Sequence, residues 1–199
     1  MKKISIINYG MGNTKSLQAS ISYFGYKSVI TSERKIIENS DTIFLPGVGA
    51  FPKAMQLLKK KKLDSLLKKK FEDGTDIVGI CLGMQLLFES SNEIKSTKGI
   101  GIIPGFVDSL NMGFNIGWKK IDKNKSNYIG KNLKSKKYYF IHSYKCIPKS
   151  KKYITSVSNF EGENFCSSVN FKNAYGFQFH PEKSGEQGLK IIQNILQRK

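Results

Sequence analysis

Cys81 stands at the centre of residues 79–83, Gly-Ile-Cys-Leu-Gly, after an apolar run and before apolar residues at helical spacing. The pattern predicts a strand, a sharp turn and a helix, with the thiol exposed at the turn as in a nucleophile elbow. Glycines at 79 and 83 let the backbone double back without Cβ clashes, and a helix N-terminus favours a thiolate. The local pattern leaves two readings open: a nucleophile, or a small buried residue that opens a helix.

His180 and Glu182 are the second candidate pair. His180 ends an apolar strand, and Pro181 favours an extended backbone at His180. The break in the strand allows the side chains of His180 and Glu182 to approach each other. A carboxylate beside an imidazole orients the ring and stabilises the imidazolium, which is the third member's role in a triad. The alternative is a polar loop in which Glu182 only favours the following helix N-terminus.

The remaining histidine and cysteines carry weaker signals. His142 ends an aromatic strand, where a hydrogen-bonded structural role is more common than catalysis. Cys146 and Cys166 lack an elbow or a nearby histidine, so we expect both to be packing residues. Three sparse cysteines without Cys-x-x-Cys indicate neither a disulfide framework nor a zinc site. We therefore expect no catalytic metal and no cofactor.

Strands and helices alternate in the first half of the chain. We expect strands at 3–8, 28–31, 41–45 and 76–81, and helices at 14–24, 33–39 and from 51 to about 72. Short connections between them predict right-handed crossovers and a mostly parallel sheet with helices on both faces. The turns at 9–13, 46–49 and 81 all lie at carboxyl ends of strands, where ligand sites collect.

After about residue 92 the alternating strand and helix patterns give way to short runs typical of β-strands. These cover 99–107, 116–121, 138–142, 153–157, 164–170 and 174–179, and a final helix is expected at 185–197. We find no repeat or linker. The chain therefore predicts one α/β domain over residues 1–199, with extra short strands in its second half.

The net charge of +18 constrains the partners. The lysines are spread along the chain and flank apolar residues, as on the solvated face of an amphipathic helix. No basic-aromatic motif or helix-turn-helix is evident, so we expect no nucleic-acid partner. No apolar run approaches the ~20 residues of a membrane span, and the apolar start is too short for a signal-peptide core. We expect a cytoplasmic protein that does not bind a membrane.

Three motifs together resemble class I (triad) glutamine amidotransferases. They are 45–51 (Leu-Pro-Gly-Val-Gly-Ala-Phe), 79–85 (Gly-Ile-Cys-Leu-Gly-Met-Gln) and 179–185 (Phe-His-Pro-Glu-Lys-Ser-Gly). Within that family the chain most resembles the glutaminase subunits of imidazole glycerol phosphate synthases, whose motifs are also matched by residues 8–13, 112–115 and 140–144. The resemblance covers essentially the whole chain and implies a flavodoxin-like sheet.

The resemblance implies that glutamine is hydrolysed to glutamate and ammonia by a Cys81–His180–Glu182 triad through a thioester. It also implies roles for two further sets of residues. The oxyanion would be met by the backbone of Leu82 and of the strand Gly47, Val48 and Gly49. Glutamine would be gripped by Gln85, Ser143 and Tyr144.

The resemblance further implies a partner, a (β/α)₈ cyclase subunit that receives the ammonia in a heterodimer. The products would be imidazole glycerol phosphate and aminoimidazole carboxamide ribotide, in histidine biosynthesis. Asn13, Trp118 and Lys183 lie in segments that match the family's partner-facing surface. The central motif 111–115 reads Asn-Met-Gly-Phe-Asn where the family usually has Met-Gly-Trp-Asn. One alternative is therefore a paralogue supplying ammonia for amidino-sugar synthesis on surface glycans. A non-catalytic binding or scaffold protein is an alternative from a different class.

Overall fold

The computed structural model describes residues 2–123 and 137–198; residues 1, 124–136 and 199 of the predicted domain lie outside the described residues. The first half contains β1 (Ile4–Ile7), α1 (Thr14–Ser22), β2 (Ser28–Thr31), α2 (Arg34–Glu38), β3 (Thr42–Gly47), α3 (Phe51–Lys60), α4 (Leu63–Glu72), β4 (Asp76–Cys81) and α5 (Leu82–Leu86). The second half contains β5 (Phe88–Ser91), β6 (Thr97–Lys98), β7 (Ile103–Ser109), β8 (Asn115–Lys123), β9 (Lys137–His142), β10 (Tyr144–Pro148), η2 (Lys151–Tyr153), β11 (Ile154–Phe160), β12 (Glu163–Phe171), β13 (Ala174–Phe177), η3 (Pro181–Lys183) and α6 (Gly185–Leu196).

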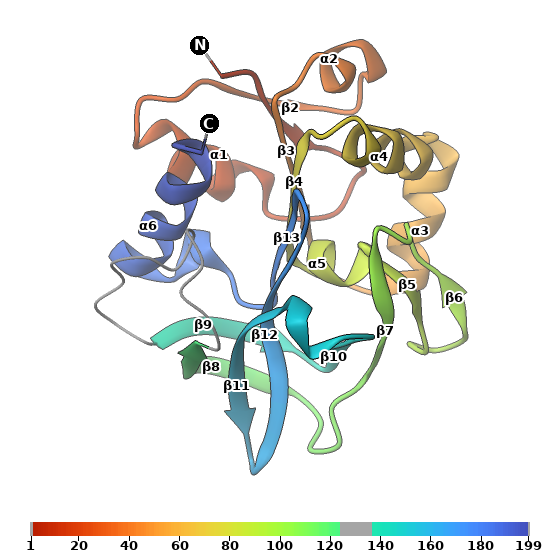
Figure 1. Cartoon of the computed structure of the whole chain (residues 1–199), viewed down its shortest axis with the longest axis vertical. Helices are drawn as coiled ribbons and strands as arrows, with labels where there is room; N and C mark the ends of the chain where they lie inside the picture. The colour runs from red at the N-terminus through yellow and green to blue at the C-terminus, as the bar shows by residue number, and fades with distance from the viewer. Residues whose placement is uncertain (1, 124–136, 199) are drawn as a thin grey trace.

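A large mixed sheet runs through the molecule in the order β2-β1-β3-β4-β13-β12-β10-β7-β5-β6. The five strands from β2 to β13 are parallel neighbours. From β13 onward the strands pair antiparallel, except that β5 is parallel to β7. Strands β11, β8 and β9 extend from β12 and lie at the lower end of the molecule in Figure 1. The predicted α/β fold class, with extra strands in the second half, is confirmed.

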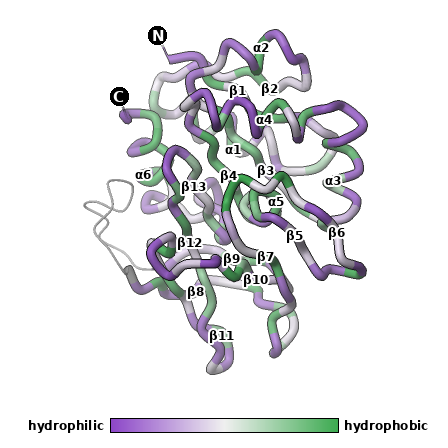
Figure 2. Tube along the Cα trace, turned by 45° about the vertical axis from the view of Figure 1, so that its right-hand side comes forward, coloured by the Kyte–Doolittle hydropathy of each residue, from purple (hydrophilic) through white to green (hydrophobic). Residues whose placement is uncertain are grey.

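Helices cover both faces of the parallel strands, as expected. Ile43 and Leu45 of β3 belong to the hydrophobic cluster that includes residues of α3, α4 and α5. Phe44, between them, belongs to the cluster formed with α1 and α6. Figure 1 shows α1 and α6 on one side of the central strands and α3, α4 and α5 on the other. Because both faces are covered, apolar residues follow one another along the central strands, and Figure 2 shows green on β3 and β4.

The single helix expected from residue 51 to about 72 is wrong, because the chain breaks at Lys62. Lys62 has a left-handed backbone with φ 53° and separates α3 from α4. Leu58 and Leu63 are both fully buried in the same cluster. Five residues in an unbroken helix would rotate these two side chains about 140° apart. The break lets both helices turn their apolar faces to the sheet.

The helix after the elbow is shorter than the apolar pattern through Phe88 predicts. Helix α5 ends at Leu86, and Phe88 begins β5 instead. The N–H groups of Ile100, Ile102 and Gly101 bond to the carbonyls of Leu86, Leu87 and Phe88, respectively. These carbonyls are thereby used by a neighbouring segment rather than by a continuing helix. The remaining expected elements agree to within a few residues, but β5, β6 and β10 were not expected.

Candidate active site

Cys81 occupies the sharp strand-turn-helix that the sequence predicts. It ends β4, precedes α5 and has φ 54° and ψ −112°, a conformation strained for a side-chain-bearing residue. A Cβ added to Gly83 would lie 1.7 Å from the Leu45 carbonyl oxygen, and one added to Gly79 would lie 2.6 Å from the Gly83 oxygen. Only glycine fits at 79 and 83, so the turn can close tightly behind the thiol.

His180 and Glu182 form the ion pair that their spacing predicts. The His180 Nδ1 lies 2.8 Å from the Glu182 Oε1, and the two side chains are 2% and 3% exposed. They follow β13, which pairs in parallel with β4, and this pairing brings them to the elbow. Burial lowers the pKa of His180, but interactions with Cys81 and Glu182 outweigh it and raise that pKa to about 10. Because Glu182 takes Nδ1, Nε2 is the nitrogen free to exchange a proton with Cys81.

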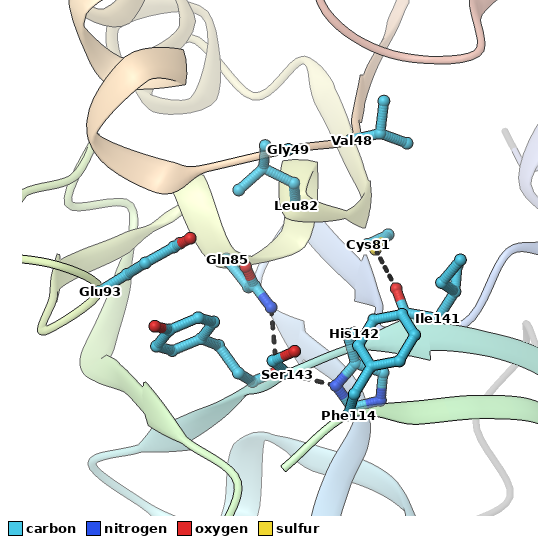
Figure 3. A pocket seen from close by; sticks show the side chains of 11 residues that line it. Val48, Gly49, Cys81, Leu82, Gln85, Glu93, Phe114, Ile141, His142 and Ser143 are labelled. Carbon is cyan, nitrogen blue, oxygen red and sulfur yellow. Dashed lines mark hydrogen bonds between the residues drawn. The ribbon is translucent and has the colours of Figure 1, made fainter.

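The expected oxyanion segment begins directly beside the nucleophile, but it is a strand only as far as Gly47, where β3 ends, and Val48 and Gly49 follow as a loop. Gly47 pairs with Cys81 in the β3–β4 register, and a Cβ on Gly47 would lie 2.7 Å from the Tyr9 hydroxyl oxygen. That buried hydroxyl donates to the Pro46 carbonyl at 3.0 Å, which anchors the start of the strand. Figure 3 shows Val48 and Gly49 on the side of the pocket opposite Ser143. Leu82 is the first residue of α5, so its N–H is not required within the helix.

A cavity of about 280 Å³ opens beside Cys81 (Figure 3). It lies between the end of β3, the elbow, and the segment joining β9 to β10. Its lining includes every expected oxyanion and glutamine-gripping residue except Gly47, which lies behind the elbow. The lining residues are Val48, Gly49, Cys81, Leu82, Gln85, Glu93, Phe114, Ile141, His142, Ser143 and Tyr144.

The backbone carbonyl of Tyr144, which is one of the lining residues, accepts hydrogen bonds from two side chains of this region. The carbonyl accepts from Gln85 Nε2 at 3.0 Å and from His142 Nδ1 at 2.8 Å. Since Nδ1 carries the hydrogen, Nε2 of His142 accepts from the Asn115 amide nitrogen, 3.0 Å away. Burial lowers the pKa of His142 to about 4, so the ring is neutral. His142 therefore has the hydrogen-bonded structural environment that we expected.

Three polar residues of this region were missed by the sequence reasoning: Glu93, Asn115 and Gln178. Glu93 is 9% exposed, lines the cavity and accepts from the Phe51 N–H at 2.9 Å, which caps α3. Burial raises the pKa of Glu93, and the Phe51 hydrogen bond opposes this. Glu93 lies in no local pattern that indicates chemistry. Asn115 closes the motif 112–115 and Gln178 stands two residues before His180, but neither position by itself indicated a role.

The three expected partner-facing residues do not line the cavity. Asn13 caps α1 by accepting from the Ser16 N–H, Trp118 is 53% exposed, and Lys183 lies exposed in η3. Trp118 packs edge-on against Tyr139 of β9. Cys146 and Cys166 are buried in the core as expected. Among residues 2–123 and 137–198, no group of three or more His, Cys, Asp or Glu side chains could hold a metal ion.

Comparison with known proteins gives the family. The model of class-I glutamine amidotransferases matches residues 5–198. The chain is 43% identical to imidazole glycerol phosphate synthase subunit HisH of Listeria innocua, over 96% of this chain and 94% of that protein. It is 34% identical to the subunit of the same name from Chlorobaculum tepidum, over 98% and 99% of the two chains. The chain belongs to the class-I glutamine amidotransferases. The resemblance predicted from its motifs is confirmed.

The fold of this amidotransferase agrees with solved structures. The structure of PurLQS from Thermotoga maritima superposes with a TM-score of 0.79 at 19% identity, covering 98% of this chain and 97% of that chain. Within the part of the chain that the structure describes, no helix is long and apolar enough to cross a membrane.

Proposed function

We propose that this protein is the glutaminase subunit of imidazole glycerol phosphate synthase and supplies ammonia for histidine biosynthesis. The observation that carries the proposal is a cysteine on a strained elbow beside a buried His180–Glu182 pair, at a cavity lined on one side by Val48 and Gly49. The names of relatives at 34–43% identity, each matched over nearly its full length, support the choice of synthase. The protein is a glutamine-hydrolysing enzyme. Residues 1–199 form one amidotransferase domain, and the protein is located in the cytoplasm.

The triad residues account for each proton in the reaction. His180 takes the proton of Cys81, and the thiolate attacks the side-chain amide carbon of glutamine. The tetrahedral intermediate collapses to a thioester as His180 returns its proton to the departing ammonia. His180 then takes a proton from water, which attacks the thioester, releases glutamate and restores the thiol. Glu182 holds Nδ1 throughout and so keeps Nε2 directed at the reaction.

The developing oxyanion lies where the elbow and the end of β3 meet. The backbone N–H of Leu82 and an N–H of the Gly47–Gly49 strand are the donors we assign to it. Losing one donor of this kind typically costs ~10²–10³ in rate. Because Gly49 has φ 104° and Val48 is 44% exposed, this strand is able to reorient a peptide at little steric cost.

The charged α-ammonium and α-carboxylate groups of glutamine bind at the end of the cavity away from Cys81. Glu93 and the Gln85 side-chain oxygen are hydrogen-bond acceptors there, and they suit the substrate's α-ammonium group. Backbone groups of Ser143 and Tyr144 lie beside them and are the partners we assign to the α-carboxylate. The cavity therefore separates the charged end of the substrate from the reacting amide at Cys81.

The partner is a (β/α)₈ cyclase subunit, bound over the mouth of the cavity. Phe114, Ile116 and Trp118 alternate along one strand segment and are each 52–54% exposed, so they share an apolar face. Phe114 also lines the cavity, which joins this face to the active site (Figure 3). Asn13 and Lys183 are the further contacts we assign to this interface. Ammonia released at Cys81 passes across it into the barrel; neither nucleic acid nor a membrane is a partner.

The direct test mixes the protein with the histidine-pathway cyclase of the same source. Glutamate release and imidazole glycerol phosphate are followed with and without the phosphoribosyl-aminoimidazole substrate. We expect strong stimulation of glutamate release together with product formation. Failure with a cyclase that is active on free ammonia would reject the histidine pathway and favour the amidino-sugar paralogue.

A substitution tests the triad within the same assay. Cys81→Ala should abolish glutamate release while the complex with the cyclase persists, and Cys166→Ala, which also removes a thiol, should retain release. Activity of Cys81→Ala near that of the wild type would contradict the assignment of the nucleophile.

A further inference from the structure

Gln178 is a fully buried amide next to the nucleophile. It lies between β13 and His180, and its backbone N–H bonds to the Ser167 carbonyl at 2.9 Å. Its side-chain nitrogen is 3.9 Å from Cys81 Sγ in hydrogen-bonding geometry, and its side-chain oxygen is 3.2 Å from Gln85 Nε2. It does not line the cavity. Gln178 therefore contacts both the nucleophile and a substrate-gripping residue without reaching the substrate.

One backbone carbonyl sets the direction of the hydrogen bonds that link Tyr144, Gln85, Gln178 and Cys81. The Tyr144 carbonyl can only accept, so the nitrogen end of the Gln85 amide must face it, at 3.0 Å. The same nitrogen donates to the neighbouring amide, so the oxygen end of Gln178 must face Gln85. The nitrogen end of Gln178 is then left for Cys81. The amide orientations follow from this order of donors and acceptors.

This order of donors and acceptors fixes which groups Gln85 and Cys81 meet at the two ends of the series. At Gln85 both N–H groups are taken, so its carbonyl oxygen is the group presented to the cavity, as Figure 3 shows. At Cys81 the sulfur meets an N–H donor, and a hydrogen bond to the charged form favours a thiolate. The protonated thiol has another partner, because Sγ lies 3.7 Å from the Ile141 carbonyl, which accepts from S–H but repels a thiolate. The two neighbours of the sulfur therefore differ: the Gln178 amide can donate to a thiolate, and the Ile141 carbonyl can accept from a thiol.

We propose that Gln178 is a positioning residue of the glutaminase site, which supports the Cys81 thiolate and holds the Gln85 amide with its oxygen toward the substrate. The proposal rests on the proposed role of Cys81 as nucleophile. It predicts that Gln178 influences two separable quantities, the protonation of Cys81 and the affinity for glutamine.

The test uses the full chain with its cyclase and two variants. Gln178→Glu is nearly isosteric but turns a donor into a carboxylate beside the sulfur. Gln178→Met keeps the length and removes both hydrogen-bonding groups. The pH dependence of Cys81 alkylation by iodoacetamide is followed by peptide mass, and the KM for glutamine is measured in parallel. Gln85→Met serves as the comparison, since it removes the substrate-facing oxygen and the donor that orients Gln178, but leaves the Gln178 amide itself beside Cys81.

For Gln178→Glu we expect the alkylation profile to move to higher pH and the rate at pH 7 to fall about tenfold, as for a like charge near a thiolate. Gln178→Met should shift the profile in the same direction and raise the KM, whereas Gln85→Met should raise the KM with a smaller shift of the alkylation profile, because the Gln178 amide remains. Folded Gln178 variants with wild-type profiles and wild-type KM would overturn the inference. That result is distinguishable from failure of the proposed function, in which Cys81→Ala itself would remain active.

Discussion

Acidification should destabilise this amidotransferase through His142. The ring is 6% exposed, donates from Nδ1 to the Tyr144 carbonyl and accepts at Nε2 from Asn115. Burial lowers the pKa of His142 from 6.5 to about 4; the hydrogen bond to Tyr144 opposes this shift, and the charge on His180 adds to it. A proton on Nε2 would also face the Asn115 N–H group. Folding therefore requires the neutral ring.

The free energy of unfolding depends on pH because the unfolded and folded states bind different numbers of protons at His142. Between pH 6.5 and about pH 4 the unfolded chain carries a proton at His142 and the folded protein does not, so the free energy of unfolding falls as the pH falls. The full effect is about 3 kcal/mol, of which about 2 kcal/mol is lost between pH 7.5 and pH 5. His180 affects stability in a different pH range. Its raised pKa stabilises the folded state fully below pH 6.5, and this contribution is lost as the pH rises toward about 10.

The assay is urea unfolding of the wild type and His142→Gln at several pH values. Glutamine cannot titrate but still offers a donor and an acceptor to the two partners of His142. The other titrating groups are common to both proteins and cancel in the difference. We expect the stability advantage of the wild type to shrink by about 2 kcal/mol from pH 7.5 to pH 5. If the free energies of unfolding of the two proteins changed equally with pH over that range, the argument that His142 is buried as a neutral ring would be refuted.

Two further substitutions test the elbow and the substrate site. Gly83→Ala places a Cβ 1.7 Å from the Leu45 carbonyl oxygen, so the free energy of unfolding should drop by at least about 1–3 kcal/mol in urea, with a large loss of glutamate release. A variant with wild-type stability and rate would show that the elbow is not closely packed. Glu93→Gln keeps an acceptor for the Phe51 N–H but removes the charge, so the KM for glutamine should rise about tenfold or more with little change in melting temperature. An unchanged KM in steady-state assays would exclude Glu93 from binding the α-ammonium.

The parts of the site that lie in local motifs could be predicted from the sequence. A glycine on each side of Cys81 predicts a tight turn, and the structure has that turn with φ 54° at the cysteine. His180 and Glu182 are two residues apart around a proline, so their contact at 2.8 Å needs only a local bend. The parallel sheet was predictable because alternating strands and helices with short connections leave few other arrangements.

Other features depended on contacts that no local pattern contains. Helix α5 stops at Leu86, where residues 100–103 bond to the carbonyls of Leu86, Leu87 and Phe88. Glu93 reaches the cavity, and Asn115 reaches His142, only through the strand order of the second half. The break at Lys62 is an intermediate case, since the phase of Leu58 and Leu63 already conflicts with one straight helix.

The local sequence indicated a candidate nucleophile at Cys81 and a candidate pair at His180 and Glu182, because turn geometry is a property of neighbouring residues. The roles of these residues and of the glycine-rich segment came from the resemblance of the motifs to the amidotransferases. Which buried amides contact these residues depends on the folded arrangement of the strands. Gln178 is 97 residues from Cys81 and 93 from Gln85, and His142 is 27 from Asn115. Whether such groups meet depends on sheet order and register, and the direction of their hydrogen bonds depends on a single backbone carbonyl, that of Tyr144.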